Sequence, residues 1–145
     1  PYLHICKMLT GYRPVEEEKL RVLWQRMPEL REPLTQIGFF DFGDLHFEVY
    51  EGRGGHLPGE IVLIDYDHSI AFTGDIYINL QGLIPPQAEH NRYAPILMTS
   101  VDTDPDTAKL QRQALPALLG KGVWKVFPGH GSVMELVVEM MVSDI

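Results

Sequence analysis

Three glycine-rich strings in this sequence each place one possible metal ligand beside an apolar, strand-like run. The strings are Gly-His-Leu-Pro-Gly at 55–59, Phe-Thr-Gly-Asp at 72–75 and Phe-Pro-Gly-His-Gly at 127–131. Their polar members, His56, Asp75 and His130, offer two imidazoles and a carboxylate, a donor set that suits a divalent transition metal. A catalytic ion needs about three protein ligands and an open position. Because no other cluster with ligand spacing is evident in the sequence, the strings predict about half of a metal site.

The apolar pattern alternates between strand-like and helix-like periods, which indicates an α/β fold with a mixed sheet and flanking helices. Strands are expected over 2–6, 45–50, 61–66, 69–73 and 123–127, and helices over 15–27, 104–120 and 133–142. Asp104 followed by Pro105 is a favourable helix start. Pro116 is expected to kink or divide that helix. A surface loop is expected over 81–103, where proline and asparagine pairs interrupt the pattern.

Composition predicts one small domain over residues 1–145, because 45% apolar residues suffice for a core. The single cysteine, Cys6, excludes an internal disulfide and is expected to be buried, which is typical of a reducing, cytoplasmic compartment. No apolar run is long enough to span a membrane. The net charge of −8 and the absence of a basic patch argue against nucleic acid as a partner.

In their order and spacing, the three strings resemble the later motifs of the metallo-β-lactamase superfamily. Those motifs are a Gly-His-x-Pro-Gly turn, a Phe-Thr-Gly-Asp strand end and a Pro-Gly-His-Gly strand end. The superfamily's earliest motif, His-x-His-x-Asp-His, does not occur in these 145 residues. The resemblance therefore implies half of the superfamily's αββα sandwich, namely its C-terminal part, over about residues 1–142. We expect either a fragment of a longer protein or a relative that has lost the first half.

The resemblance also implies a role for each ligand. His56 would hold a first metal ion, His130 a second one, and Asp75 would bridge both. The expected ion is zinc, with iron or manganese as alternatives. A water between the ions would lose a proton near neutral pH and attack a carbonyl or phosphoryl centre. Glu60 departs from the superfamily pattern, because many relatives have a small polar residue after the Pro-Gly turn.

Each residue has a simpler interpretation as well. A histidine in a turn is usually solvated or hydrogen-bonded, and an aspartate such as Asp75 can cap the loop after its strand. His68 is expected in a solvated hairpin turn. Tyr77 is expected to face the core or the surface, although it lies close enough to Asp75 in sequence to reach a substrate. His46 has no partner at ligand spacing.

Three functions remain open from the sequence. The first is a metal-dependent hydrolase of an ester, thioester, lactone, lactam or phosphodiester, inactive without the missing half and acting on a small molecule. The second is a binding or scaffold domain with a vestigial or single-metal site made by His56, Asp75 and His130. The third is an iron-dependent oxidoreductase of the same superfamily. Because half a sandwich leaves strand faces and edges exposed, we expect the missing half or a second copy of the chain as a partner.

Overall fold

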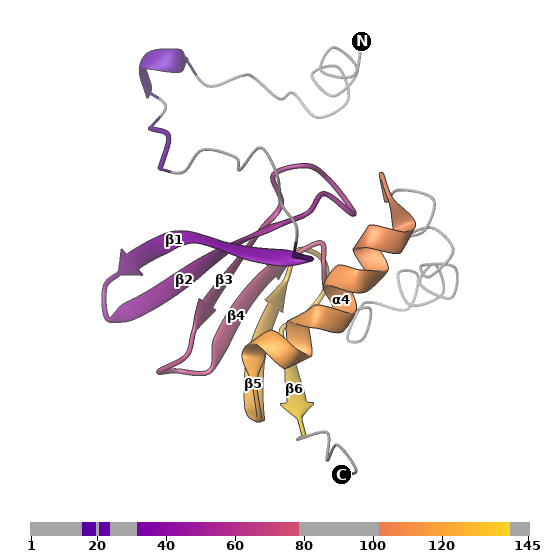
Figure 1. The fold of residues 1–145 in the computed structure, drawn as a ribbon. Coiled ribbons are helices and arrows are strands. Elements are labelled where there is room, and N and C mark those ends of the chain that lie inside the picture. The colour runs from indigo at the N-terminus through magenta and orange to yellow at the C-terminus, as the bar shows by residue number, and fades with distance from the viewer. Residues whose placement is uncertain (1–15, 20, 24–31, 79–101, 140–145) are drawn as a thin grey trace.

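The computed structural model describes residues 16–19, 21–23, 32–78 and 102–139, which form a mixed six-stranded sheet and one α-helix (Figure 1). The fold is mostly β, which is loosely compatible with the expected α/β class. The strands are β1 (Leu34–Phe42), β2 (Leu45–Gly52), β3 (Ile61–Asp65), β4 (Ile70–Gly74), β5 (Gly122–Pro128) and β6 (Met134–Val138). The helices are α4 (Pro105–Leu119) and the single 3-10 turn η1 (Glu17–Lys19).

The strands lie in the sheet in the order in which they occur in the chain. Strands β1 to β4 form an antiparallel meander, β4 and β5 are parallel, and β6 pairs antiparallel with β5. The connection from β4 to β5 includes α4, which crosses one face of the sheet (Figure 1). A parallel pair needs such a crossover, because a short hairpin reverses the strand direction. The same pairing places the C-terminal ends of β4 and β5 side by side.

Four of the five expected strands are confirmed, with ends that differ by at most two residues. In β2, Phe47 and Val49 face one side of the sheet and Tyr50 the other, and all three side chains are buried, so both faces of this strand are covered. The predicted turn between β3 and β4 is confirmed as well. Strand β1 was not predicted, although it pairs with β2 along most of its length. Glycine and aspartate within 34–42 weaken the strand signal there.

The hydrophobic core lies between the sheet and α4. The helix contributes Leu115 and Leu119, which are almost fully buried. The sheet residues of this core are Leu34, Tyr50, Val62, Ile64, Ala71, Trp124 and Val126. Asp104 caps the helix as predicted, because its side chain accepts a hydrogen bond from the Thr107 backbone N–H at 3.1 Å.

Pro116 does not divide α4, which continues through it to Leu119. A proline in the last turn removes only one intrahelical hydrogen bond, and burial of Leu115 and Leu119 on either side stabilises the continuous helix. The Gly120 backbone N–H donates to the Pro116 carbonyl at 3.1 Å and ends the helix.

The helix predicted over 133–142 is wrong for its described part. Residues Met134–Val138 form strand β6. In this strand Leu136 pairs with Trp124 and Met134 with Val126 on the face toward α4. Valine is frequent in this segment, and β-branched residues favour strands. The apolar residues of this segment are compatible with the period of a helix and with that of a strand. Pairing with β5 stabilises the strand.

The helix predicted over 15–27 is also wrong where the structure describes it. Residues 17–19 form only the turn η1, and residues 21–23 are not helical. The Leu23 side chain in this segment is 49% exposed. A short helix without a packed face is marginal in water, so acidic residues and propensity alone do not form one here. The expectations for strand 2–6, for Cys6 and for a loop over 81–101 lie outside the described residues.

Replacing Leu115 with alanine is expected to lower the free energy of unfolding by about 2–5 kcal/mol, because its side chain is fully buried against the sheet. Leu110 provides a matched control on the same helix, since it is 49% exposed. Leu110→Ala is expected to change stability by less than about 0.5 kcal/mol. Urea denaturation measures both; equal losses would contradict the described helix face.

No helix among the described residues is both long enough and apolar enough to cross a membrane.

Candidate metal centre

The three predicted ligands come from three different loops, which lie at the same end of the strands β2, β4 and β5. Asp75 follows β4 directly, and His130 lies two residues beyond the end of β5. Gly74 pairs with Pro128 at the ends of these parallel strands, which brings Asp75 and His130 together. His56 lies in the loop between β2 and β3.

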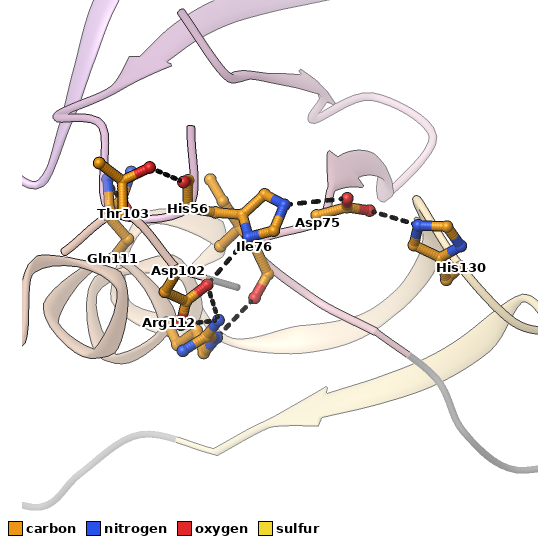
Figure 2. Close-up of polar contacts among 9 residues, drawn as sticks. His56, Asp75, Ile76, Asp102, Thr103, Gln111, Arg112 and His130 are labelled. Carbon is orange, nitrogen blue, oxygen red and sulfur yellow. Dashed lines mark hydrogen bonds and ion pairs between the residues drawn. The ribbon is translucent and has the colours of Figure 1, made fainter. Parts of the chain in front are cut away.

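Asp75 lies between the two histidines, and each of its carboxylate oxygens faces one of them (Figure 2). The Nε2 atom of His56 is 3.3 Å from Oδ2, and the Nε2 atom of His130 is 3.5 Å from Oδ1. His56 is largely buried, whereas the His130 side chain is 71% exposed. The site therefore has a closed side at His56 and an open side at His130.

These separations are longer than the 2.7–3.2 Å of typical N–H···O hydrogen bonds. Two ligands bound to one tetrahedral zinc ion lie roughly 3.4 Å apart, given zinc–nitrogen and zinc–oxygen distances of about 2.0–2.2 Å. The distances of 3.3 and 3.5 Å thus fit a nitrogen and an oxygen that share an ion. The donor set of imidazoles and carboxylates fits a divalent metal as well.

Among the residues that the structure describes, no three histidine, cysteine, aspartate or glutamate side chains are grouped around one point as ligands of one ion. The three predicted ligands instead form a row, with the carboxylate in the middle (Figure 2). Each oxygen of the Asp75 carboxylate therefore faces a different imidazole nitrogen.

The loop that carries His56 is attached to the start of α4. The backbone N–H of Gly55 donates to Oε1 of Gln111 at 3.0 Å, and Gln111 is almost fully buried. The His56 carbonyl accepts from the hydroxyl of Thr103 at 2.7 Å. A Cβ on Gly55 would lie 2.4 Å or less from backbone atoms of Ala108. The glycine is therefore required for this close approach of loop and helix.

Asp75 is held by a second close contact, between the ends of β4 and β5. The backbone N–H of Gly129 donates to the Gly74 carbonyl at 2.7 Å, which extends the β4–β5 pairing beyond the strands. A Cβ on Gly129 would lie 2.1 Å from Oδ1 of Asp75. Gly129 therefore leaves the space that the carboxylate occupies next to His130.

Two residues of the site were missed by the sequence analysis. Asp102 has a fully buried side chain, and its Oδ1 lies 2.9 Å from Nδ1 of His56. Arg112 of α4 donates to the same carboxylate, with Nη2 3.1 Å from Oδ2 (Figure 2). The sequence contained two weak indications of them: Asp102 lies just before the cap of the predicted helix, and Arg112 lies on the face of that helix that points toward the site. Neither signal is specific without the fold.

Glu60 is a third carboxylate beside the ligands. Its Oε2 atom is buried and has no hydrogen-bond partner among the described residues. The pKa of Glu60 is raised to about 7, chiefly by burial; the charge of His56 opposes this increase and the charge of Asp75 adds to it. Among the described residues, Asp75, Asp102 and Glu60 lie around His56, and Arg112 is the cation that contacts Asp102. This excess of carboxylates favours a cation at the site.

Replacing Glu60 with glutamine is expected to reduce the pH dependence of stability in the metal-free chain. Because the pKa of Glu60 is raised in the folded state, the folded chain binds more protons than the unfolded chain between about pH 4.5 and 7. The free energy of unfolding therefore falls as the pH rises through this range. In the unsubstituted chain Glu60 should lower the free energy of unfolding by on the order of 2 kcal/mol over this pH range, allowing for partial solvent exposure. Glu60→Gln should remove this decrease. Urea denaturation at about pH 5 and about pH 8 measures it; identical pH slopes would contradict the prediction.

The remaining described histidines lie in separate pairs. His46 contacts Asp41 through Nδ1 at 2.9 Å on the surface, and this contact raises the pKa of His46. His68 is partly exposed, as expected in its turn, but it also contacts the buried Asp65 at 3.0 Å. Tyr77 packs against the core, which agrees with its simpler interpretation.

Comparison of the chain with models of known protein families and with functionally characterised proteins found no match.

Proposed function

We propose that this chain carries part of the active site of a metal-dependent hydrolase of the metallo-β-lactamase superfamily. The observation that carries the proposal is the row of His56, Asp75 and His130. Each carboxylate oxygen of Asp75 faces one imidazole nitrogen at 3.3 or 3.5 Å, a separation that fits two ligands of one ion. In the proposed site, His56 and Asp75 would hold one ion, and His130 and Asp75 would hold the second.

The donor set supports zinc, with iron or manganese as alternatives, because imidazole and carboxylate suit all three ions. Bound divalent ions would polarise the carbonyl or phosphoryl oxygen of a substrate and lower the pKa of a water molecule. The protein holds the ligands in place and leaves one side of the site open to a substrate. The buried His56 is held by its loop and by Asp102, whereas the exposed His130 lies where a substrate enters.

Each ion would have two ligands from the described residues, whereas a catalytic zinc ion needs about three. We therefore propose that a His-x-His-x-Asp-His segment completes both ions, supplied by the same polypeptide or by a second chain. In this account the six-stranded sheet with α4 corresponds to half of an αββα sandwich. The row of ligands favours this arrangement over a scaffold domain with a single ion, because each carboxylate oxygen of Asp75 faces a different histidine.

Hydrolysis assays test the proposal. The zinc-loaded 145-residue chain is assayed alone and together with the completing His-x-His-x-Asp-His segment, with a thioester, a lactone, a β-lactam and a phosphodiester as substrates. We expect metal-dependent hydrolysis of at least one class when the completing segment is present and little by the chain alone. The exposed His130→Ala variant should lose this activity. Hydrolysis that persists after removal of the metal, or in His130→Ala, would refute the proposal.

A further inference from the structure

We infer that Asp102 and Arg112 are positioning residues for the proposed metal ligands, with Asp102 determining which nitrogen of His56 is free to bind an ion. The inference rests on the proposed function and adds two residues to it that the sequence motifs do not contain. It also connects the ligands to the helix α4.

Asp102 contacts the side of the His56 ring that faces away from Asp75. Its Oδ1 lies 2.9 Å from Nδ1, while the Nε2 atom of the same ring faces Asp75 (Figure 2). A carboxylate can only accept a hydrogen bond, so Nδ1 carries the proton and Nε2 keeps its lone pair for a metal. Because the Asp102 side chain is fully buried, water does not compete for this contact. Ligating histidines are commonly oriented in this way by an outer carboxylate.

Arg112 connects both sides of the site. Its Nη2 donates to both oxygens of Asp102, at 3.3 and 3.1 Å, and its Nε donates to the Ile76 carbonyl at 3.2 Å. Ile76 follows Asp75 directly in the chain. One guanidinium thus fixes the carboxylate behind His56 and the backbone beside Asp75. We infer that this bridge from α4 holds the two ligands at their separation of 3.3 Å.

Replacing Asp102 with asparagine should reverse the proton position on His56. In the isosteric amide, the oxygen is best placed toward the Arg112 donors, which turns the NH2 group toward Nδ1 of His56. The amide then donates to Nδ1, and the ring proton moves to Nε2. The ligating lone pair is lost in this tautomer. We expect zinc affinity to fall by about 10- to 100-fold, the usual effect of losing an outer-shell partner.

Two measurements test the inference. Zinc affinity is measured by competition with a chromophoric chelator. The tautomer is measured in the metal-free chain by nitrogen NMR of the histidine rings at about pH 9, where imidazoles with ordinary pKa values are neutral. Asp41→Asn is the matched control, because Asp41 contacts Nδ1 of His46 at the same 2.9 Å but on the surface. It should change neither the zinc affinity nor the His56 tautomer.

The inference is supported if Asp102→Asn moves the proton of His56 to Nε2 and weakens zinc binding at least about 10-fold. It is overturned if the tautomer is unchanged, or if zinc affinity stays within about twofold of the unsubstituted chain. The hydrolysis assays test the proposed function separately, whereas the tautomer tests the role of Asp102 alone. If Asp102→Asn does not fold, Arg112→Gln tests the bridge from α4, because it leaves Asp102 as the acceptor at Nδ1 of His56 and removes the contact to the Ile76 carbonyl. In that variant we expect an unchanged tautomer and a zinc affinity at least about 10-fold lower. Zinc affinity within about twofold of the unsubstituted chain would overturn the inference.

Discussion

Replacing Asp75 with alanine is expected to weaken zinc binding strongly, because this one side chain faces both histidines of the proposed centre. Each ion would lose one of its two ligands from the described residues. Loss of an outer-shell partner already costs about 10- to 100-fold in affinity, so the loss of a shared ligand should exceed about 100-fold. Competition with a chromophoric chelator measures the affinity, and circular dichroism checks that the variant is folded.

Asp67→Ala provides the control for the Asp75 variant. Asp67 is an exposed aspartate in the turn between β3 and β4, at the other end of strand β4 from Asp75. Its replacement removes the same charge and should leave zinc affinity unchanged. Equal affinities of Asp75→Ala and the unsubstituted chain would rule out Asp75 as a ligand.

Gly55→Ala is expected to combine a loss of stability with a loss of metal binding. The new methyl group would lie 2.2 Å from the Gln111 side chain and 2.3 Å from the Ala108 backbone nitrogen. The backbone of α4 cannot move easily, because Leu115 and Leu119 hold the helix on the sheet. The loop must therefore move away and take His56 with it. Overpacking of this kind costs about 1–3 kcal/mol, and zinc affinity should fall at least about 10-fold.

Gly43→Ala separates the effect of overpacking from the effect of backbone strain. Gly43 lies in the β1–β2 turn with a φ of +65°, and a Cβ there would have no neighbour within 4 Å. Its replacement should cost about 1–2 kcal/mol through the left-handed backbone alone and leave zinc affinity unchanged. Urea denaturation and chelator competition apply to both variants. Retention of full zinc affinity by Gly55→Ala would show that the loop position does not determine His56.

The parts of the fold that were predicted correctly are those with local signals. Helix α4 has an aspartate cap, a proline in its first turn and an apolar stripe, and the β3–β4 hairpin has two short apolar runs around a polar turn. The segment 133–142 has no such unambiguous signal, because its valines and leucine suit a strand as well as a helix. Its pairing with β5 is a tertiary interaction that local propensity does not contain.

The residues of the candidate site also fall into two groups, those with a local sequence signal and those placed only by the fold. The sequence motifs contain His56, Asp75 and His130 because each lies in a glycine-rich turn at a strand end. Asp102 contacts His56 across 46 residues of chain, and its role depends on the position of α4. A buried carboxylate behind a histidine has no local pattern, so only the fold could place it there. The close approach of Gly55 to α4 depends on the fold for the same reason.

The most direct test of the central claim is the anomalous scattering of zinc in crystals of this chain grown with zinc. The account predicts anomalous density beside the Asp75 carboxylate, between one of its oxygens and the Nε2 atom of His56, and between the other oxygen and the Nε2 atom of His130. Zinc density elsewhere, for example at His46 or His68, with none at Asp75, would contradict the account.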